Sequence, residues 1–186
     1  MEADDYLSMQ TLSLLTFVSG LFVGSICSEA AQPTKLNIPV PELQGNQWMN
    51  SEPLSMAGRL GKVTIVHFWT FDCINCRHNL PSYERWEAKL QGKDVAIIGI
   101  HTPELPQERV TANVGKKVAE YHIKWPVLLD TDMKNWRKWK QEFWPCVYLV
   151  DKMGKIRYRW DGELNYGGMD GERKMLQLVE NLLAEN

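Results

Sequence analysis

The sequence is short of cysteine and has no strong excess of either charge, and these absences exclude several classes of protein. Four cysteines in 186 residues are too few for a disulfide scaffold. A formal net charge of -2 provides no basic footprint for nucleic acid, and no internal repeat or low-complexity tract occurs. With 44% hydrophobic and 24% charged residues, the composition is typical of a globular chain. The length suits one domain with a full-sized core.

Lysine and arginine are absent from residues 1–30, and this absence bears on the fate of the N-terminus. Residues 6–28 carry no charge, and Ser28 and Ala30 are small residues suitably spaced for a cleavage site. Residues 1–30 are therefore predicted to be a cleaved signal peptide, although the start is acidic rather than basic. The uncharged run is also long enough to span a bilayer, so an uncleaved membrane anchor is the alternative. Lipid attachment at Cys27 is the third interpretation.

The rest of the chain divides into a linker and one domain. Residues 31–45 contain Pro33, Pro39 and Pro41 and are predicted to be a linker. Residues 46–186 are predicted to form the domain, in which apolar runs alternate with helical patterns. Strands are expected at 63–69, 95–100, 126–129, 147–150 and 156–160, and helices at 74–90, 106–121, 133–142 and 169–184. This order predicts an α/β fold with a central mixed sheet flanked by helices and parallel βαβ units.

Cys73 and Cys76 form a Cys-x-x-Cys pair between an expected strand and an expected helix. Free backbone N–H groups and the helix dipole at such a helix start stabilise a thiolate. Cys73 is then the nucleophile that attacks a disulfide, and Cys76, one turn further on, is the resolving thiol. We therefore expect both cysteines to be catalytic.

Metal or haem sites are other uses of paired cysteines, and the sequence supports them less well. A c-type haem site requires histidine directly after the second cysteine, where this chain has Arg77. A structural zinc site requires four ligands, and no second spaced pair exists. A copper-binding module with two thiolates and a distant histidine remains an alternative. No cofactor and no metal are expected in the favoured interpretation.

The stretch from Phe68 to Cys76, with Pro81 five residues after the pair, resembles the thioredoxin-like superfamily. The resemblance is closest to exported TlpA/ResA-like proteins and the periplasmic domains of DipZ-type proteins. The run His101-Thr102-Pro103-Glu104 and the dipeptide Trp144-Pro145 agree with it. The resemblance implies a thioredoxin-like fold over roughly residue 54 to the C-terminus and thiol–disulfide oxidoreductase activity. It also implies that Pro145 is the active-site cis-proline.

The resemblance also marks residues with supporting roles. Trp69 and Trp144 are expected to be walls of the active-site surface. His67 occupies the place of thioredoxin's buried strand carboxylate, so it is either a proton carrier for the resolving cysteine or a hydrogen-bonded core histidine. Asp72 is expected to cap the helix, the alternative being that its charge raises the pKa of the nucleophile. Cys146 is expected to be a small strand residue, the alternatives being a second disulfide partner or a metal ligand.

ResA-like proteins have a glutamate three residues after the second cysteine, where this chain has Asn79. A general base is therefore not expected from that position.

The sequence and the resemblance together predict a reductant of disulfides in exported proteins, located in the periplasm or anchored to a membrane and facing the extracytoplasmic side. Its expected partners are protein disulfides or dithiols and an upstream thiol redox partner, either soluble or membrane-bound, with no nucleic acid. A peroxiredoxin-like thiol peroxidase is the second hypothesis, because Thr70 lies three residues before Cys73. Val66 stands where that class has a proline, which counts against it. The copper-binding module is the third hypothesis.

Overall fold

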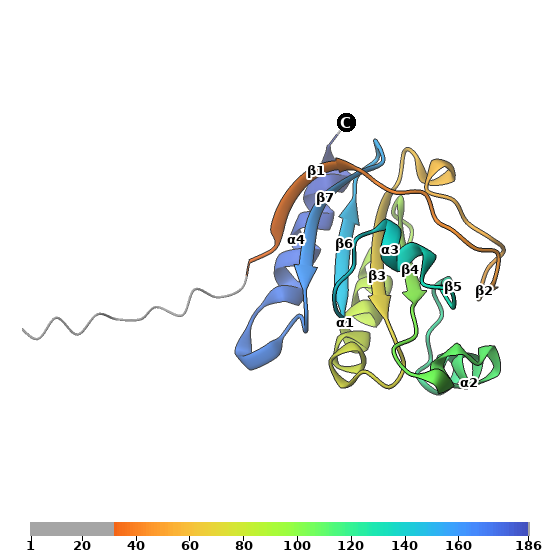
Figure 1. Cartoon of the computed structure of the whole chain (residues 1–186). Coiled ribbons are helices and arrows are strands. Elements are labelled where there is room, and N and C mark those ends of the chain that lie inside the picture. The colour runs from red at the N-terminus through yellow and green to blue at the C-terminus, as the bar shows by residue number, and fades with distance from the viewer. Residues whose placement is uncertain (1–31, 186) are drawn as a thin grey trace, which may run out of the picture.

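The computed structural model describes residues 32–185, so the predicted signal peptide or anchor at 1–30 lies outside the described residues. The chain alternates strands and helices (Figure 1). The strands are β1 (Thr34–Pro39), β2 (Trp48–Met49), β3 (Val63–Trp69), β4 (Val95–His101), β5 (Val127–Leu129), β6 (Cys146–Val150) and β7 (Lys155–Asp161). The α-helices are α1 (Ile74–Leu90), α2 (Thr111–Glu120), α3 (Lys134–Lys138) and α4 (Gly171–Ala184). Short 3₁₀ helices are η1 (Ala57–Arg59), η2 (Pro106–Arg109) and η3 (Tyr166–Gly168).

These strands form one mixed sheet in the order β1-β7-β6-β3-β4-β5-β2. β3 pairs in parallel with β4, and β4 with β5, whereas every other neighbouring pair is antiparallel. β3 lies in the middle of the sheet, and each of its residues is buried. Its β-branched and aromatic sequence suits a strand that is covered on both faces. The predicted mixed sheet with flanking helices is therefore confirmed.

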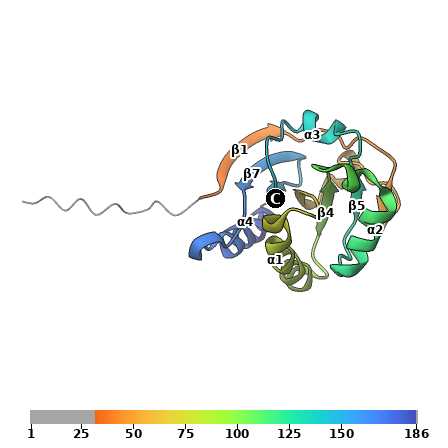
Figure 2. The ribbon, with the colours of Figure 1, turned by 60° about the horizontal axis from the view of Figure 1, so that its bottom comes forward.

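Alternation along β3 divides the core into two clusters, one on each face of the sheet. Ile65 and Trp69 pack with side chains of α1 and α4, whereas Val66 and Phe68 pack with Trp139 beside α3. Figure 2 shows α3 and α1 on opposite sides of the strands. The loop between β3 and α1 emerges at the edge of the cluster that α1 and α4 cover, and this position sets the location of the cysteine pair.

The segment expected to be a linker, 31–45, contains part of the sheet, which corrects that prediction. Thr34–Pro39 is strand β1, paired antiparallel with β7 at one edge, and β2 follows soon after at the opposite edge. Figure 1 shows this N-terminal segment crossing the molecule from one edge to the other. Most β1 side chains are exposed, so the strand carries no apolar pattern that sequence could have revealed.

Two of the expected helices are shorter than predicted. The span 106–121 is η2 followed by α2, because Val110 adopts an extended backbone conformation between them. The span 133–142 holds only the short α3, which begins after Met133 and ends before Lys140, both with positive φ. Residues in the left-handed conformation interrupt helical hydrogen bonding, so α3 is shorter than the helix that the sequence pattern of residues 133–142 predicts.

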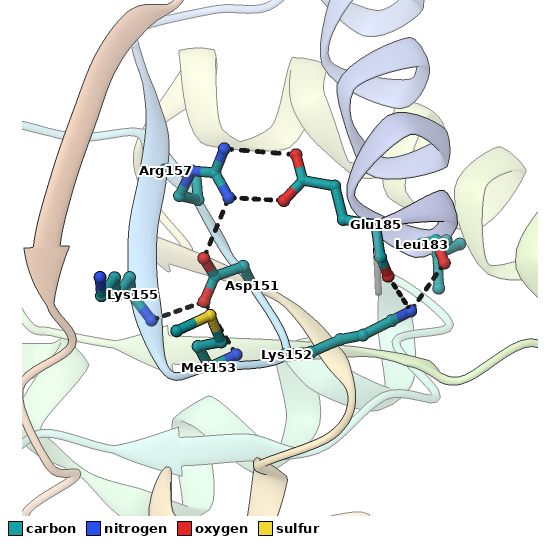
Figure 3. A network of polar contacts seen from close by, with 7 residues as sticks. All are labelled: Asp151, Lys152, Met153, Lys155, Arg157, Leu183 and Glu185. Atoms are coloured by element: carbon teal, nitrogen blue, oxygen red, sulfur yellow. Dashed lines mark hydrogen bonds and ion pairs between the residues drawn. The ribbon is translucent and has the colours of Figure 1, made fainter.

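The hairpin between β6 and β7 holds the C-terminal end of α4 through charged contacts (Figure 3). Arg157 donates to Glu185 at 2.7 and 3.2 Å and to buried Asp151 at 3.1 Å. The Lys152 ammonium donates to the backbone carbonyls of Leu183 and Glu185 at 2.8 and 2.5 Å. A cation on the last carbonyls of a helix satisfies groups that have no partner within the helix. This cluster therefore fastens α4 to the sheet.

No helix among residues 32–185 combines the length and the apolar character required to cross a membrane.

Candidate active site

Cys73 occupies the N-cap position of α1, directly after the buried end of β3 and the turn that follows it. Its sulfur accepts a hydrogen bond from the backbone N–H of Cys76 at 3.2 Å. Cys73 is partly exposed, whereas Cys76 is 1% exposed and packs in the core cluster under α1. Both cysteines are free thiols. The arrangement presents one sulfur to solvent and stores the other one turn deeper.

The two thiols differ in acidity as well as in exposure. A hydrogen bond from the Cys76 thiol, helped by the backbone N–H groups of Cys76 and Asn75, lowers the pKa of Cys73 below its usual value despite partial burial. Burial, together with the nearby Cys73 sulfur, raises the pKa of Cys76 well above the usual value. A thiolate therefore forms first on Cys73, the accessible sulfur, and this is the arrangement that nucleophilic attack on a disulfide requires.

Asp72 does not cap α1, which corrects the expectation from sequence. The N-cap acceptor is the Cys73 sulfur, and the Asp72 carboxylate instead accepts a hydrogen bond from the Gln107 side chain at 3.0 Å. The Asp72 backbone N–H donates to Glu108 at 3.0 Å. Both contacts tie the turn before Cys73 to η2 rather than to its own helix.

The Trp144–Pro145 peptide bond is cis, and Trp144 lies at the edge of the core cluster that contains Cys76. The Trp144 indole N–H donates to the Thr102 carbonyl at 3.1 Å, and its ring packs against Trp136 with ring centroids 4.0 Å apart. Cys73 and Trp144 are both partly buried against this one cluster. The role of Trp144 as a wall of the active-site surface stays a prediction.

Trp69 is 1% exposed, so it is a core residue and does not line the surface. The expectation for this residue is corrected because β3 is covered on both faces, leaving no side chain of the strand in contact with solvent.

His67 is fully buried in the middle of β3. Its Nε2 accepts a hydrogen bond from the Trp125 indole at 2.9 Å, and its ring lies 4.2 Å from that of Tyr83. Burial lowers the pKa of His67 to about 3, so the imidazole is neutral at physiological pH. A Cβ at Gly99 would lie 2.9 Å from Nε2, and this close approach accounts for glycine inside β4. These contacts favour the core-histidine interpretation over the proton carrier.

Cys146 is buried in the other core cluster, on the opposite face of the sheet from Cys76. Its thiol donates to Asp161 at 3.0 Å and accepts from Arg159 at 3.2 Å. Burial and the Asp161 carboxylate raise the pKa of Cys146 to about 12. These contacts engage the thiol on the far face and keep it protonated, in agreement with a structural role.

Asn79 connects α1 to the loop after β7. It is 1% exposed, donates to the Gly162 carbonyl at 3.2 Å and accepts from the Leu164 backbone N–H at 2.8 Å. A glutamate here could not supply the donated bond when ionised. The amide therefore serves this connection, and the position provides no general base.

Sequence reasoning missed Glu108, the buried carboxylate beside the turn that precedes Cys73. It is 1% exposed and accepts hydrogen bonds from backbone and side-chain donors on both loops around the site. Neither charge nor spacing distinguishes Glu108 from exposed Glu104 in the sequence, because its donors come together only in the fold. Thr70 and His101 lie in motifs that sequence had marked, but their mutual contact at 3.4 Å was not foreseen.

Within residues 32–185, no three histidine, cysteine or acidic side chains gather in a way that would hold a metal ion. A copper site built from the pair and a third residue therefore has no preformed ligand set in the described part of the chain.

A partly exposed, acidic cysteine at a helix start after the central strand defines the class of thioredoxin-like thiol–disulfide oxidoreductases. Comparison with known proteins agrees. The AhpC/TSA family model matches residues 36–159, and this chain belongs to that family. The protein DipZ of Mycobacterium bovis is 34% identical over 76% of this chain, but the match spans only 21% of DipZ.

Two further matches extend over nearly the whole length of the matching chain. The thiol-disulfide oxidoreductase YkuV of Bacillus subtilis is 28% identical over 81% of this chain and 98% of its own. The solution structure of a thioredoxin-like protein in its oxidized form is 28% identical, with a TM-score of 0.69 over 82% of this chain and 99% of its own.

Proposed function

We propose that this chain reduces disulfide bonds in exported proteins through the Cys73–Cys76 pair. The observation that carries the proposal is the asymmetry of the two sulfurs at the start of α1. Cys73 is partly exposed and accepts the Cys76 backbone N–H at 3.2 Å, whereas Cys76 is buried and stays protonated. One sulfur is thus prepared for attack and the other for resolution.

The reaction has two exchange steps. The Cys73 thiolate attacks one sulfur of a substrate disulfide, which forms a mixed disulfide and releases the other substrate sulfur as a thiolate. Cys76 then loses its proton to that leaving thiolate or to solvent and attacks the Cys73 sulfur. The second substrate thiol leaves, and Cys73 and Cys76 are joined as a disulfide. Two electrons have passed to the substrate, and an upstream dithiol donor must return them.

The proposal also covers the direction of electron transfer and the location of the protein in the cell. The uncharged segment at residues 6–28, which ends at Ser28 and lies just before Ala30, supports export as a periplasmic protein or as one anchored on the outer face of a membrane. The upstream donor would then be a membrane-bound thiol protein that carries electrons across, because the outer compartment holds no reducing thiol pool.

The reduction potential of the pair is the measurement that tests the direction. The full-length chain would be equilibrated with dithiothreitol or glutathione buffers, and the thiols would then be trapped and counted. A two-electron couple near the thioredoxin value of about -270 mV supports a reductant, whereas a value near -120 mV reverses the direction. The absence of any reversible couple would overturn the oxidoreductase proposal. Cys146→Ser serves as the control, because that thiol lies in the opposite core cluster.

A thiol peroxidase is the second candidate, because the family model that matches residues 36–159 is that of AhpC/TSA proteins. Thr70 is fully buried, and its hydroxyl contacts His101 and Glu108. The hydroxyl is therefore already engaged and is not free to bind a peroxide at Cys73. Hydrogen peroxide consumption by the reduced chain, compared with its rate of insulin disulfide reduction, distinguishes the two candidates. Peroxide turnover faster than disulfide reduction would favour the peroxidase.

A further inference from the structure

Glu108 lies in η2 and accepts hydrogen bonds from two separate loops. Its Oε1 accepts from the Asp72 backbone N–H at 3.0 Å, and its Oε2 accepts from the N–H groups of Glu104 and Leu105 at 2.7 Å each. The Thr70 hydroxyl is a fourth donor. A carboxylate has about four acceptor sites, so this one is fully used. The bonds to Glu104 and Leu105 are an ordinary capping arrangement, whereas those from Asp72 and Thr70 reach across to the turn before Cys73.

A second link runs through Thr70 to the end of β4. The Thr70 oxygen lies 3.4 Å from His101 Nε2, and the His101 ring stacks on Phe71 with centroids 5.6 Å apart. Burial lowers the pKa of His101 to about 4, so the ring is neutral. The Thr70 hydroxyl donates its proton to Glu108, so its oxygen can only accept from His101. A neutral His101 ring that carries its proton on Nε2 supplies this hydrogen bond. The residues that lead into Cys73 are thus held on one side by His101 and Glu108.

The charge state of Glu108 follows from these bonds. Burial alone would favour the protonated acid, but donors from Thr70, Leu105, Asp72 and Glu104 outweigh burial and lower the pKa of Glu108. All four donors are neutral, so the negative charge is solvated but not cancelled. That charge adds to burial and the Cys73 sulfur in raising the pKa of Cys76.

We infer that Glu108 is a positioning residue for the Cys73–Cys76 reaction: it clamps the backbone ahead of Cys73 to the loop after β4, and its fixed charge directs the thiolate to Cys73 rather than to Cys76. This inference rests on the proposed dithiol function but adds a residue outside the pair. It differs from a proton carrier, because a carboxylate with four donors has no reason to take up a proton during turnover.

The test compares Glu108→Gln with Glu104→Gln in the full-length chain. The ionisable groups on the elements around the pair are Asp72 in the turn before it, Arg77, His78 and Tyr83 on α1, His101 at the end of β4, Glu104 after β4 and Glu108 in η2. Glu104 is the matched control, because it is exposed and its charge acts on Cys73 instead of Cys76. The readout is the pKa of each cysteine in the reduced protein, obtained by NMR titration of ¹³Cβ-labelled cysteine, with circular dichroism to verify folding.

Glu108→Gln is expected to lower the pKa of Cys76 by about one unit, in line with the loss of one buried charge nearby. It is also expected to reduce the rate of insulin disulfide reduction at pH 7 about tenfold, because the amide places a donor against backbone donors and loosens the turn. Glu104→Gln is expected to leave the pKa of Cys76 within about 0.3 units, because its charge acts on Cys73. A folded Glu108→Gln protein with an unchanged pKa of Cys76 would overturn the inference.

Glu108→Asp distinguishes the effect of the Glu108 charge from the effect of its hydrogen bonds to the turn. It also tests the inference if Glu108→Gln does not fold. It keeps the charge but shortens the reach, so the pKa of Cys76 should stay near the original value while the rate falls. A rate equal to that of the unaltered chain would overturn the clamp, and a pKa of Cys76 that falls as far as one unit would overturn the role of the charge. The titration needs no disulfide substrate, so it remains interpretable even if the unaltered chain proves unable to reduce insulin.

Discussion

At the scale of single residues, Cys73 and Cys76 differ in what each can reach. Cys73 meets solvent, whereas Cys76 meets only the core and the neighbouring sulfur. Under the proposed function, a substrate sulfur bonds to Cys73 first, and internal attack by Cys76 then releases it. This ordering makes the two single substitutions unequal in their consequences.

Cys76→Ser is expected to trap substrates as stable mixed disulfides on Cys73, because the resolving thiol is missing. Cys73→Ser is expected to trap none and to lower disulfide reduction to the uncatalysed background. Non-reducing gels and mass spectrometry of the trapped species measure both results. Cys146→Ser, the control, should retain the original rate within about twofold, since its thiol is engaged by Asp161 and Arg159 on the far face. Equal trapping by both pair variants would contradict the assignment of roles.

His67 and His101 make stability depend on pH. Burial lowers the pKa of His67 to about 3 and that of His101 to about 4, whereas both titrate near 6.5 in the unfolded chain. Between pH 7 and pH 5 these two histidines take up about 1.5 protons in the unfolded chain and almost none in the folded chain, so acid favours unfolding. The free energy of unfolding is expected to fall by about 2 kcal/mol per histidine over this range. Urea denaturation at the two pH values measures the fall, and equal midpoints would contradict it.

The sequence was sufficient to find the cysteine pair but not its surroundings. The Cys-x-x-Cys spacing marks Cys73 and Cys76 only together with its place between a strand and a helix, Pro81 and the Trp144-Pro145 dipeptide. Asp72 was misassigned because aspartate is a common N-cap and cysteine is not, so the sulfur was overlooked as the capping acceptor. Glu108 could not be found, since its four donors converge only after β3, β4 and η2 have packed.

At the scale of elements, buried strands were predictable and exposed ones were not. β3 and β4 are long apolar runs, and their predicted bounds agree with the structure to within one residue. β1 is mostly exposed and β2 has two residues, so neither carries a hydrophobic period. Both are defined by backbone pairing with distant strands, β7 and β5, which sequence periodicity does not report.

Two glycines in helices provide a matched prediction about packing. A Cβ at Gly171, the first residue of α4, would lie 2.3 Å from the Leu164 carbonyl oxygen and 2.5 Å from the Trp160 ring. A Cβ at Gly115 in α2 would meet only the end of Met49, at 3.5 Å. Gly171→Ala is therefore expected to destabilise the fold by about 1–3 kcal/mol through overpacking.

Gly115→Ala is expected to stabilise the fold by about 0.5–1 kcal/mol, because alanine is the better helix former and has space. Urea denaturation of both variants measures the difference in sign. If Gly171→Ala proved neutral, the close packing of α4 on Trp160 would be refuted.

At the scale of the whole molecule, residues 34–49 close both edges of the sheet. β1 covers β7 at one edge, and β2 covers β5 at the other. Between them, Glu42 accepts hydrogen bonds from the backbone of Met56 and Ala57, so the connecting segment is fastened along its path. The N-terminal segment is thus a belt around the domain, and the domain begins earlier than the sequence suggested.

Two truncated chains test the belt. A chain that starts at residue 32 keeps β1, whereas one that starts at residue 46 loses β1 and exposes the edge of β7. The shorter chain is expected to be less stable by at least about 2 kcal/mol, because several backbone hydrogen bonds worth roughly 1 kcal/mol each are lost. It should also aggregate more readily through the open edge, as light scattering would show. Equal stability of the two chains would restore the linker interpretation of residues 31–45.

The belt also has a consequence in time. Thr34 pairs with Arg159, so the first strand to leave the ribosome must wait for the last strand of the sheet before it finds a partner. Contacts between such distant residues form late, because the long intervening loop must first be ordered. We therefore expect the pairing of Thr34–Pro39 with β7 to be a late step of folding. Until β7 has been made, Thr34–Pro39 has no strand to pair with.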